Sequence, residues 1–141
     1  MTTKRVLVVD DHPPTRLLIR SVLQAEKEIQ YDVVEAGSGK ECLMAADAKG
    51  PFELILLDVN LPDMDGFDVC RAIRRVDTDV PIVFVTGLGE LKDFAAGRAA
   101  GGDSYIVKPI ARQALRSLVS LFTSVHRARS RKTARAGGEG V

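Results

Sequence analysis

Short apolar runs recur five times along the chain, and each is closed by a turn signal. They are rich in β-branched residues and too short to be whole helices, so each indicates a buried strand. We expect strands over 5–9, 32–35, 82–85 and 104–107, and one more in an apolar run that ends at Leu57. Pro62 prevents that third strand from continuing as a central strand.

Helical patterns fill the intervals between these strands. The first carries Leu17, Leu18, Val22 and Leu23. The second begins at Ser38, where Glu41 completes a capping box, and ends at Gly50-Pro51. A third begins at Asp65-Gly66 with Phe67, Cys70 and Ile73 facing inward. A fourth surrounds Phe94, and a fifth places Ile110, Ala114, Leu118, Leu121 or Phe122, and Val125 on one stripe. Alternation of this kind predicts a doubly wound α/β domain with a parallel sheet.

Polar residues follow the strands at their carboxyl ends, where open parallel sheets bind ligands. Asp10 and Asp11 follow the first strand and Asp58 follows the third. If those strands are neighbours, three carboxylates converge within about 5 Å, and each pair repels by roughly 3 kcal/mol. Such a cluster requires a cation, and an all-oxygen set suits Mg²⁺, with Mn²⁺ as a substitute.

Two further residues at the same edge suit phosphoryl transfer. Thr86 follows the fourth strand and Lys108 follows the fifth. Asp58 can act as the nucleophile, Lys108 and the metal can neutralise phosphoryl oxygens, and Thr86 can donate a hydrogen bond to one of them. The expected product is an acyl phosphate on Asp58.

Composition limits the protein class. With 141 residues and 45% hydrophobic content, the chain is long enough for one core. It shows neither a membrane-spanning run nor a signal-peptide pattern, so we expect a cytoplasmic protein. Cys42 and Cys70 have no metal-site spacing and are interpreted as buried thiols.

Charge divides the chain into two parts. The whole sequence has a net charge of +1, but residues 127–141 contain five Lys or Arg and one Glu, which leaves the preceding part acidic. We therefore place a domain at 1–126 and a basic, disordered tail at 127–141.

At this point the chain resembles the receiver domains of response regulators from two-component signalling. The likeness rests on VLVVDDHPPTR, LILLDVNLPDMDGFDVCRAIR, PIVFVTG and YIVKP, in that order, and covers residues 4 to about 126. It implies a flavodoxin-like (βα)5 fold with strand order 2-1-3-4-5. It also implies a signalling phosphoacceptor rather than an enzyme, with at most self-phosphorylation from small donors and self-dephosphorylation.

The resemblance assigns roles by position. Asp58 matches the phosphoacceptor; Asp11 matches a direct metal ligand, Asp10 one that acts through water, and Asn60 one that offers its backbone carbonyl. Thr86 and Lys108 match the switch hydroxyl and the phosphate-binding lysine. Further matches are an aromatic switch at Tyr105, a cis peptide between Lys108 and Pro109, and control of phosphate lifetime by Asn60 and Leu88.

Each assignment has a simpler alternative. Asp11 could be only a helix cap, Tyr105 could be only a packing residue, and Asp63, Asp65 and Asp68 fit turns and caps better than a metal site. An aspartyl phosphatase would place a proton donor where Asn60 stands, so we disfavour that enzyme class. A flavodoxin-like cofactor domain would need a phosphate-cradling loop after the first strand, where Asp10-Asp11 would repel the ligand.

The expected partners follow from the same resemblance. A histidine kinase or a histidine phosphotransfer protein would supply the phosphoryl group. With no second module apparent, we expect a stand-alone receiver that signals to an unidentified protein through its fourth helix, fifth strand and fifth helix. The basic tail permits nucleic-acid or membrane contact, but it lacks aromatic residues, and we expect neither as the partner.

Overall fold

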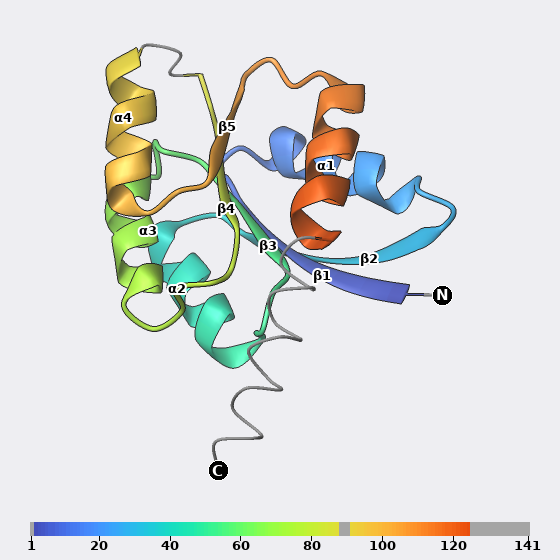
Figure 1. The fold of residues 1–141 in the computed structure, drawn as a ribbon, viewed down its shortest axis with the longest axis horizontal. Helices are drawn as coiled ribbons and strands as arrows, with labels where there is room; N and C mark the ends of the chain where they lie inside the picture. The colour runs from blue at the N-terminus through green and yellow to red at the C-terminus, as the bar shows by residue number, and fades with distance from the viewer. Residues whose placement is uncertain (1, 88–90, 125–141) are drawn as a thin grey trace.

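A five-stranded parallel sheet organises the structure, a computed structural model that describes residues 2–87 and 91–124 (Figure 1). The strands are β1 (Thr2–Val9), β2 (Ile29–Ala36), β3 (Leu54–Leu57), β4 (Ile82–Thr86) and β5 (Ser104–Val107). Their order in the sheet is β2-β1-β3-β4-β5, as the sequence resemblance implied. The strand order therefore reverses between β1 and β3.

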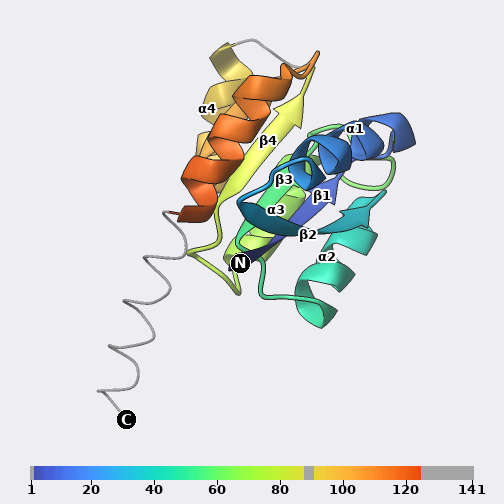
Figure 2. The same cartoon turned by 90° about the vertical axis from the view of Figure 1, so that its right-hand side faces the viewer.

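Helices cover both faces of the sheet. The helices are α1 (Pro13–Gln24), α2 (Gly39–Ala48), α3 (Gly66–Arg74) and α4 (Leu91–Ala100), and a C-terminal helix runs from 112 to the last described residue, 124. α1 and the C-terminal helix pack on one face, and α2, α3 and α4 pack on the other (Figures 1 and 2). The predicted doubly wound architecture is confirmed.

The alternation of side chains along each strand builds two cores. In β1, Val6 and Val8 face α1 and the C-terminal helix, whereas Leu7 and Val9 face α2 and α3. Every residue of β3 and β4 is buried, because both strands lie inside the sheet and are covered on both faces. These continuous apolar runs are the feature that made the central strands predictable.

Strand β1 begins earlier than expected, at Thr2, because it pairs with β2 over eight residues. The added part includes Lys4, which is buried and donates a hydrogen bond from Nζ to Thr123 Oγ1 at 3.2 Å. A lysine does not add to an apolar pattern even when it is buried, which explains why the sequence pattern did not predict this first part of the strand.

Two helical stripes were partly wrong. Leu17 is 63% exposed, and the buried residues of α1 are Ile19, Val22 and Leu23. In the C-terminal helix Ala114 is exposed, while Leu115 and Val119 are fully buried; of the alternatives Leu121 and Phe122, Phe122 packs against the core and Leu121 is exposed. Neighbouring apolar positions allow more than one stripe on a short helix, and packing selects between them. Val125 lies outside the described residues.

Helix termini follow local rules. Ser38 caps α2 by accepting a hydrogen bond from the Glu41 N–H at 3.1 Å, and the Glu41 carboxylate accepts from the Gly37 N–H. Asp65 caps α3 by accepting from the Phe67 N–H at 2.8 Å. The predicted starts of both helices are therefore confirmed.

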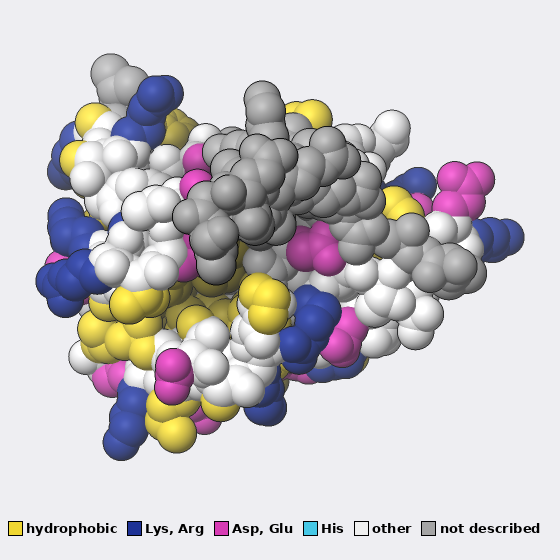
Figure 3. Space-filling view, turned by 60° about the horizontal axis from the view of Figure 1, so that its bottom comes forward, with side chains coloured by type: hydrophobic (Ala, Val, Ile, Leu, Met, Phe, Trp, Pro, Cys, Tyr) yellow, Lys and Arg dark blue, Asp and Glu magenta, His cyan; other side chains and the backbone are white. Residues whose placement is uncertain are grey.

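An apolar cleft of about 220 Å³ lies between α2 and α3, near Pro51 and Val80, which precede β3 and β4. Figure 3 shows hydrophobic side chains gathered on one side of this end of the molecule. The cleft therefore opens at the amino ends of the central strands, away from the edge that carries the acidic residues.

Gly66 allows α3 to start directly against the end of β3. Its N–H donates to the Val59 carbonyl at 2.7 Å, and an added Cβ would lie 2.7 Å from Val59 Cα and overlap the Asp58 carbonyl oxygen. Asp58 and Val59 are buried, so their backbone atoms cannot easily shift to make room for a side chain at position 66, and this position requires glycine.

We predict that Gly66→Ala lowers the free energy of unfolding by about 1–3 kcal/mol, the usual range for overpacking. Gly87→Ala is the matched control, because nothing lies within 4 Å of its added Cβ. The control should leave stability unchanged or raise it by up to about 1 kcal/mol. Urea denaturation of both variants measures the difference, and equal values for the two would contradict this account of Gly66.

Candidate functional site

The register of the sheet brings the acidic residues together. Val9 of β1 pairs with Leu57 of β3, so the residues that follow them, Asp10 and Asp58, emerge side by side at the reversal of strand order. The Asp58 N–H donates to the Val9 carbonyl at 2.9 Å, which fixes the two chain ends against each other. Asp11 is the next residue along, and it is exposed.

One carboxylate oxygen from each of Asp10, Asp11 and Asp58 lies within 4.8 Å of the other two. Asp10 and Asp58 are only 1% and 5% exposed, so little water is available to screen them. The convergence predicted from the sequence is confirmed. Among the described residues, no other cluster of three His, Cys, Asp or Glu meets the same criterion.

Lys108 supplies the positive charge between the two buried acids. Its Nζ donates to Asp10 Oδ2 at 2.7 Å and to Asp58 Oδ2 at 3.1 Å. The position of this lysine follows from the sheet, because Thr86 pairs with Val107 and the Lys108 N–H donates to the Thr86 carbonyl at 2.9 Å. Residues from β1, β3, β4 and β5 thus meet at one edge.

Protonation at this site reflects burial first. Burial raises the pKa of Asp58, and the neighbouring Asp10 raises it further, against the lowering effects of the Asn60 N–H and of Lys108. Partial burial works to lower the pKa of Lys108, but its hydrogen bonds to Asp10 and then Asp58 outweigh this, so its pKa is raised. The lysine stays charged, and Asp58 is the acid that is costly to ionise.

The donor set fits a hard divalent cation. Three carboxylates within reach of one another, without imidazole or thiolate, are typical of Mg²⁺ or Mn²⁺ ligands. The raised pKa of Asp58 is consistent with a carboxylate whose charge is under-compensated by protein groups alone. The acidic triad could therefore hold a divalent metal.

Asp11 does not cap the first helix. The N-cap of α1 is His12, and its side chain makes no capping hydrogen bond. The His12 N–H instead donates to Asp10 Oδ1 at 2.9 Å, and its ring Nδ1 lies 2.8 Å from Thr15 Oγ1. The alternative that Asp11 serves only as a cap is therefore wrong. Its carboxylate instead belongs to the acidic cluster with Asp10 and Asp58.

Thr86, Asn60 and Lys108-Pro109 belong to the strand ends and loops at this edge of the sheet. Thr86 ends β4 and is fully buried. Asn60 is exposed, and its N–H donates to Asp58 Oδ1 at 3.1 Å. The peptide bond between Lys108 and Pro109 is cis. Leu88 lies outside the described residues.

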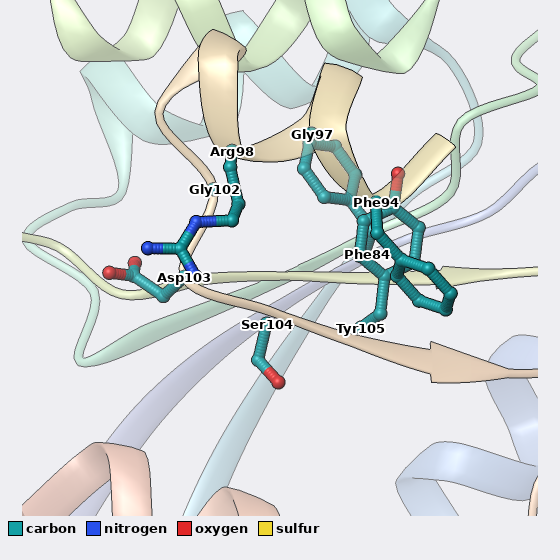
Figure 4. A pocket seen from close by; sticks show the side chains of 8 residues that line it. All are labelled: Phe84, Phe94, Gly97, Arg98, Gly102, Asp103, Ser104 and Tyr105. Carbon is teal, nitrogen blue, oxygen red and sulfur yellow. The ribbon is translucent and has the colours of Figure 1, made fainter. Parts of the chain in front are cut away.

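Tyr105 lies at the centre of an aromatic group, facing α4. Its ring packs 5.2 Å from Phe84 and 4.5 Å from Phe94, between ring centroids, and its hydroxyl donates to the Asp93 carbonyl. Burial, followed by the charge of Asp93, raises the pKa of Tyr105 to about 12. Figure 4 shows the three rings together beside Gly97, where an added Cβ would lie 2.6 Å from the Tyr105 ring.

A cavity of about 300 Å³ adjoins these rings, between α4 and the start of β5. Arg98 and Asp103 lie at the opposite side of it from the rings (Figure 4). Its walls are formed by Phe84, Phe94, Gly97, Arg98, Gly102, Asp103, Ser104 and Tyr105. This cavity is separate from the acidic cluster, although Phe84 and Tyr105 belong to β4 and β5, whose carboxyl ends lie at the edge of the sheet that carries the cluster.

Sequence reasoning missed two supports of the site. Arg16 donates from a terminal guanidinium nitrogen to the Asp10 carbonyl at 2.6 Å and from Nε to Glu35 Oε1 at 3.0 Å, which holds the acidic turn against β2. Asp63, interpreted only as a turn or cap residue, accepts hydrogen bonds from two backbone N–H groups of α2. The Arg16–Glu35 and Asp63–α2 contacts join segments that are distant in the sequence, so no local pattern could have revealed them.

The two cysteines are buried, unpaired thiols, as predicted. Burial raises the pKa of Cys42 to about 12 and that of Cys70 to about 11. Neither belongs to the acidic cluster.

Comparison with known proteins identifies this arrangement. The family profile of the response regulator receiver domain matches residues 6–120. The chain belongs to the response regulator receiver family. The members of this family are signalling phosphoacceptors rather than enzymes, and the acidic pocket of Asp10, Asp11 and Asp58 is typical of them.

Curated relatives of this receiver domain are longer proteins. The chain is 36% identical over 116 residues to a probable transcriptional regulator, ycf27, of Cyanophora paradoxa, which covers 82% of this chain and 46% of that protein. It is 40% identical over 106 residues to the DNA-binding response regulator MtrA of Mycolicibacterium smegmatis, which covers 75% of this chain and 44% of that protein. The chain thus spans about half the length of these relatives.

Solved receiver domains have the same fold over almost their whole length. A CheY-like receiver domain protein from Methanospirillum hungatei superposes with a TM-score of 0.82 at 27% identity, covering 90% of this chain and 98% of that one. The chemotaxis response regulator CheY4 of Vibrio cholerae gives 0.78 at 30% identity, covering 85% and 98%. Within the described residues, no helix is long and apolar enough to cross a membrane.

The raised pKa of Asp58 gives a test by pH. The pKa of Asp58 is higher in the folded state than in the unfolded state. Between these two pKa values the folded receiver binds more protons than the unfolded chain, so its stability falls as pH rises through this range. Asp58→Asn removes this loss. We expect the variant to have a larger free energy of unfolding than the wild type at pH 7 in metal-free buffer, and the difference to shrink as pH falls toward about 4.

Asp47→Asn, which changes an exposed carboxylate on α2, is the control and should alter stability by less than about 0.5 kcal/mol. Urea denaturation in chelator at several pH values measures both variants. A wild type as stable as Asp58→Asn at every pH would contradict the costly ionisation of Asp58.

Proposed function

We propose that this receiver domain stores a signal as a phosphoryl group on Asp58, transferred from a histidine kinase or a histidine phosphotransfer protein in the presence of Mg²⁺. The observation that carries the proposal is the grouping of three carboxylates, two of them hydrogen-bonded to Lys108, at the reversal of strand order. Membership of the receiver family implies a cognate histidine kinase.

In the transfer, a carboxylate oxygen of Asp58 forms a bond to phosphorus while the phosphorus–nitrogen bond of a phosphohistidine breaks. The electron pair of the broken bond stays with the histidine ring, which takes up a proton. The low exposure of Asp58, 5%, supports nucleophilic attack by limiting competition from water. Mn²⁺ is expected to substitute for Mg²⁺.

The metal would be held by Asp11 and Asp58 directly, by Asp10 through water, and by the backbone carbonyl of Asn60. When bound, Mg²⁺ would supply positive charge to the transferring phosphoryl oxygens. The chemistry of the carboxylate set supports this assignment. Asn60 cannot donate a proton to a leaving group, which supports a stored acyl phosphate rather than rapid turnover.

Lys108 and Thr86 are the proposed switch. Lys108 Nζ lies 3.1 Å from Asp58 Oδ2, so it is placed to follow the new charge onto a phosphoryl oxygen. Thr86 is joined to Lys108 through the backbone, and we expect its hydroxyl to reorient toward the same phosphoryl group. Phosphorylation adds about −1.5 to −2 charges, enough to attract both groups.

Signal output is proposed to pass to the surface formed by α4, β5 and the C-terminal helix. Tyr105 is the proposed relay, because it lies on β5 and its hydroxyl donates to α4 at Asp93. Asn60 and Leu88 are proposed to tune phosphate lifetime; Leu88 is not among the residues that the structure describes. The downstream target is unidentified; the DNA-binding relatives suggest a regulator of transcription as one class of partner.

Mass spectrometry tests the acceptor. Incubation with acetyl phosphate and Mg²⁺ should add one phosphoryl group to the wild type and none to Asp58→Asn, because the amide is not a nucleophile of the same kind. Asp47→Asn, with its change on exposed α2, should be modified like the wild type. Phosphate that survives in Asp58→Asn, or none in the wild type, would refute the proposal.

Lys108→Ala tests charge compensation. Loss of one partner of a buried pair costs about 3–5 kcal/mol, but the Lys108 side chain is 27% exposed, so we expect a loss of about 2 kcal/mol in metal-free buffer. Mg²⁺ binds only the folded state and should restore much of this loss. Affinity for Mg²⁺ should be equal to that of the wild type or higher, because a competing cation is removed.

Lys40→Ala, an exposed lysine on α2, is the control for Lys108→Ala and should change stability by less than about 0.5 kcal/mol with or without Mg²⁺. Hydrogen exchange after treatment with acetyl phosphate should show altered protection in α4 of the wild type but not of Lys108→Ala. If α4 of Lys108→Ala showed the same change in protection as α4 of the wild type, the switch role of this lysine would be contradicted.

A further inference from the structure

The loop between β3 and α3 carries Asn60, whose carbonyl is the proposed fourth metal ligand. Its two ends are fixed by local contacts: the Asn60 N–H donates to Asp58 Oδ1, and Asn60 pairs with Asp65 in an isolated antiparallel bridge. The residues between them, 61–64, are exposed or half-buried and are not part of any helix or strand. Their position depends on contacts with other elements.

Asp63 makes such a contact with α2. Its Oδ1 accepts a hydrogen bond from the Gly39 N–H at 2.8 Å, and its Oδ2 accepts from the Lys40 N–H at 2.9 Å. The first N–H groups of a helix have no partner within the helix, and the positive end of the helix dipole favours a carboxylate there. The bonds from Lys40 and Gly39 hold the pKa of Asp63 below its ordinary value, so it is charged at neutral pH.

Met64 and Gly39 extend this contact. An added Cβ at Gly39 would lie 2.8 Å from Met64 Sδ and 2.9 Å from Met64 Cβ, so the loop packs against a position where α2 has no side chain. α2 itself is anchored in the core by Cys42, which is fully buried. The loop is therefore fastened to a helix that is fixed to the sheet.

The same loop faces the acidic cluster. Asp11 and the loop residues from Val59 to Asp65 line one open cleft of about 460 Å³. Asp63 does not belong to the carboxylate cluster that could hold a metal. Its effect on a metal must therefore pass through the loop that it holds.

We propose that Asp63 is a positioning residue for the metal site: by binding the first two N–H groups of α2 it holds the Asn60 loop in place, so that Mg²⁺ does not have to order this loop when it binds. This inference rests on the proposed metal site at Asp10, Asp11 and Asp58. Partners that orient metal ligands typically change metal affinity by about 10- to 100-fold when removed. Because Asp63 acts on a single backbone carbonyl, we expect the lower end of this range.

The structure offers a matched control in Ser38. Its hydroxyl accepts from the Glu41 N–H at 3.1 Å, so Ser38→Ala also removes a hydrogen bond at the start of α2, but one between two residues of that segment rather than one to the loop. Both variants should lower the melting temperature by a few degrees. Only Asp63→Ala should weaken Mg²⁺ binding.

Isothermal titration calorimetry with MgCl₂ measures the effect on the wild type, Asp63→Ala, Asp63→Asn and Ser38→Ala. We expect a Kd about tenfold higher for Asp63→Ala and within twofold of the wild type for Ser38→Ala. Asp63→Asn should be intermediate, because its side-chain oxygen can accept one of the two N–H bonds. If Asp63→Ala fails to fold by circular dichroism, Asp63→Asn against Ser38→Ala gives the comparison.

An unchanged Kd in the folded Asp63 variants, or an equal rise in Ser38→Ala, would overturn the positioning role. A wild type that binds no Mg²⁺ would instead overturn the proposed metal site, so the two failures are distinguishable.

Discussion

The bridge from the Lys108 ammonium to the buried carboxylates of Asp10 and Asp58 is the interaction on which the site depends. Two carboxylates with almost no solvent exposure repel each other, and the lysine is the compensating charge that the protein itself provides. The compensation is incomplete, since the pKa of Asp58 remains raised. Because its negative charge is not fully compensated, the site is stabilised by any group that brings more positive charge or redistributes the negative charge.

The sheet makes this concentration of charge possible. Parallel strands end at one edge, and hydrogen bonds along β1, β3, β4 and β5 fix which residues come next to each other there. Because β3, β4 and the end of β1 are apolar and buried, the polar residues that follow them have few ways to move apart. The stability of the two cores thus sustains an arrangement that is electrostatically unfavourable.

The fold and the main site residues could be predicted because they depend on local patterns. Apolar strands followed by Asp10, Asp58, Thr86 and Lys108 indicated a parallel sheet with polar residues at one edge, and the family resemblance supplied the strand order that brings them together. In the C-terminal helix the prediction of Ala114 was wrong because packing chose its neighbour Leu115, and of the two alternatives Leu121 and Phe122 it is Phe122 that packs against the core. The contacts of Arg16 with Glu35 and of Asp63 with Gly39 could not be predicted, since each joins segments that are brought together only by folding.

The two tyrosines lie on opposite faces of the sheet, and the sequence contains no tryptophan. Tyr105 packs among aromatic rings facing α4, whereas Tyr31 belongs to the core beneath α1 and the C-terminal helix. Ultraviolet emission from this protein therefore arises from one residue in each core. Replacing either tyrosine by phenylalanine would leave a single intrinsic fluorophore, and each layer of the molecule could be observed separately without an added label.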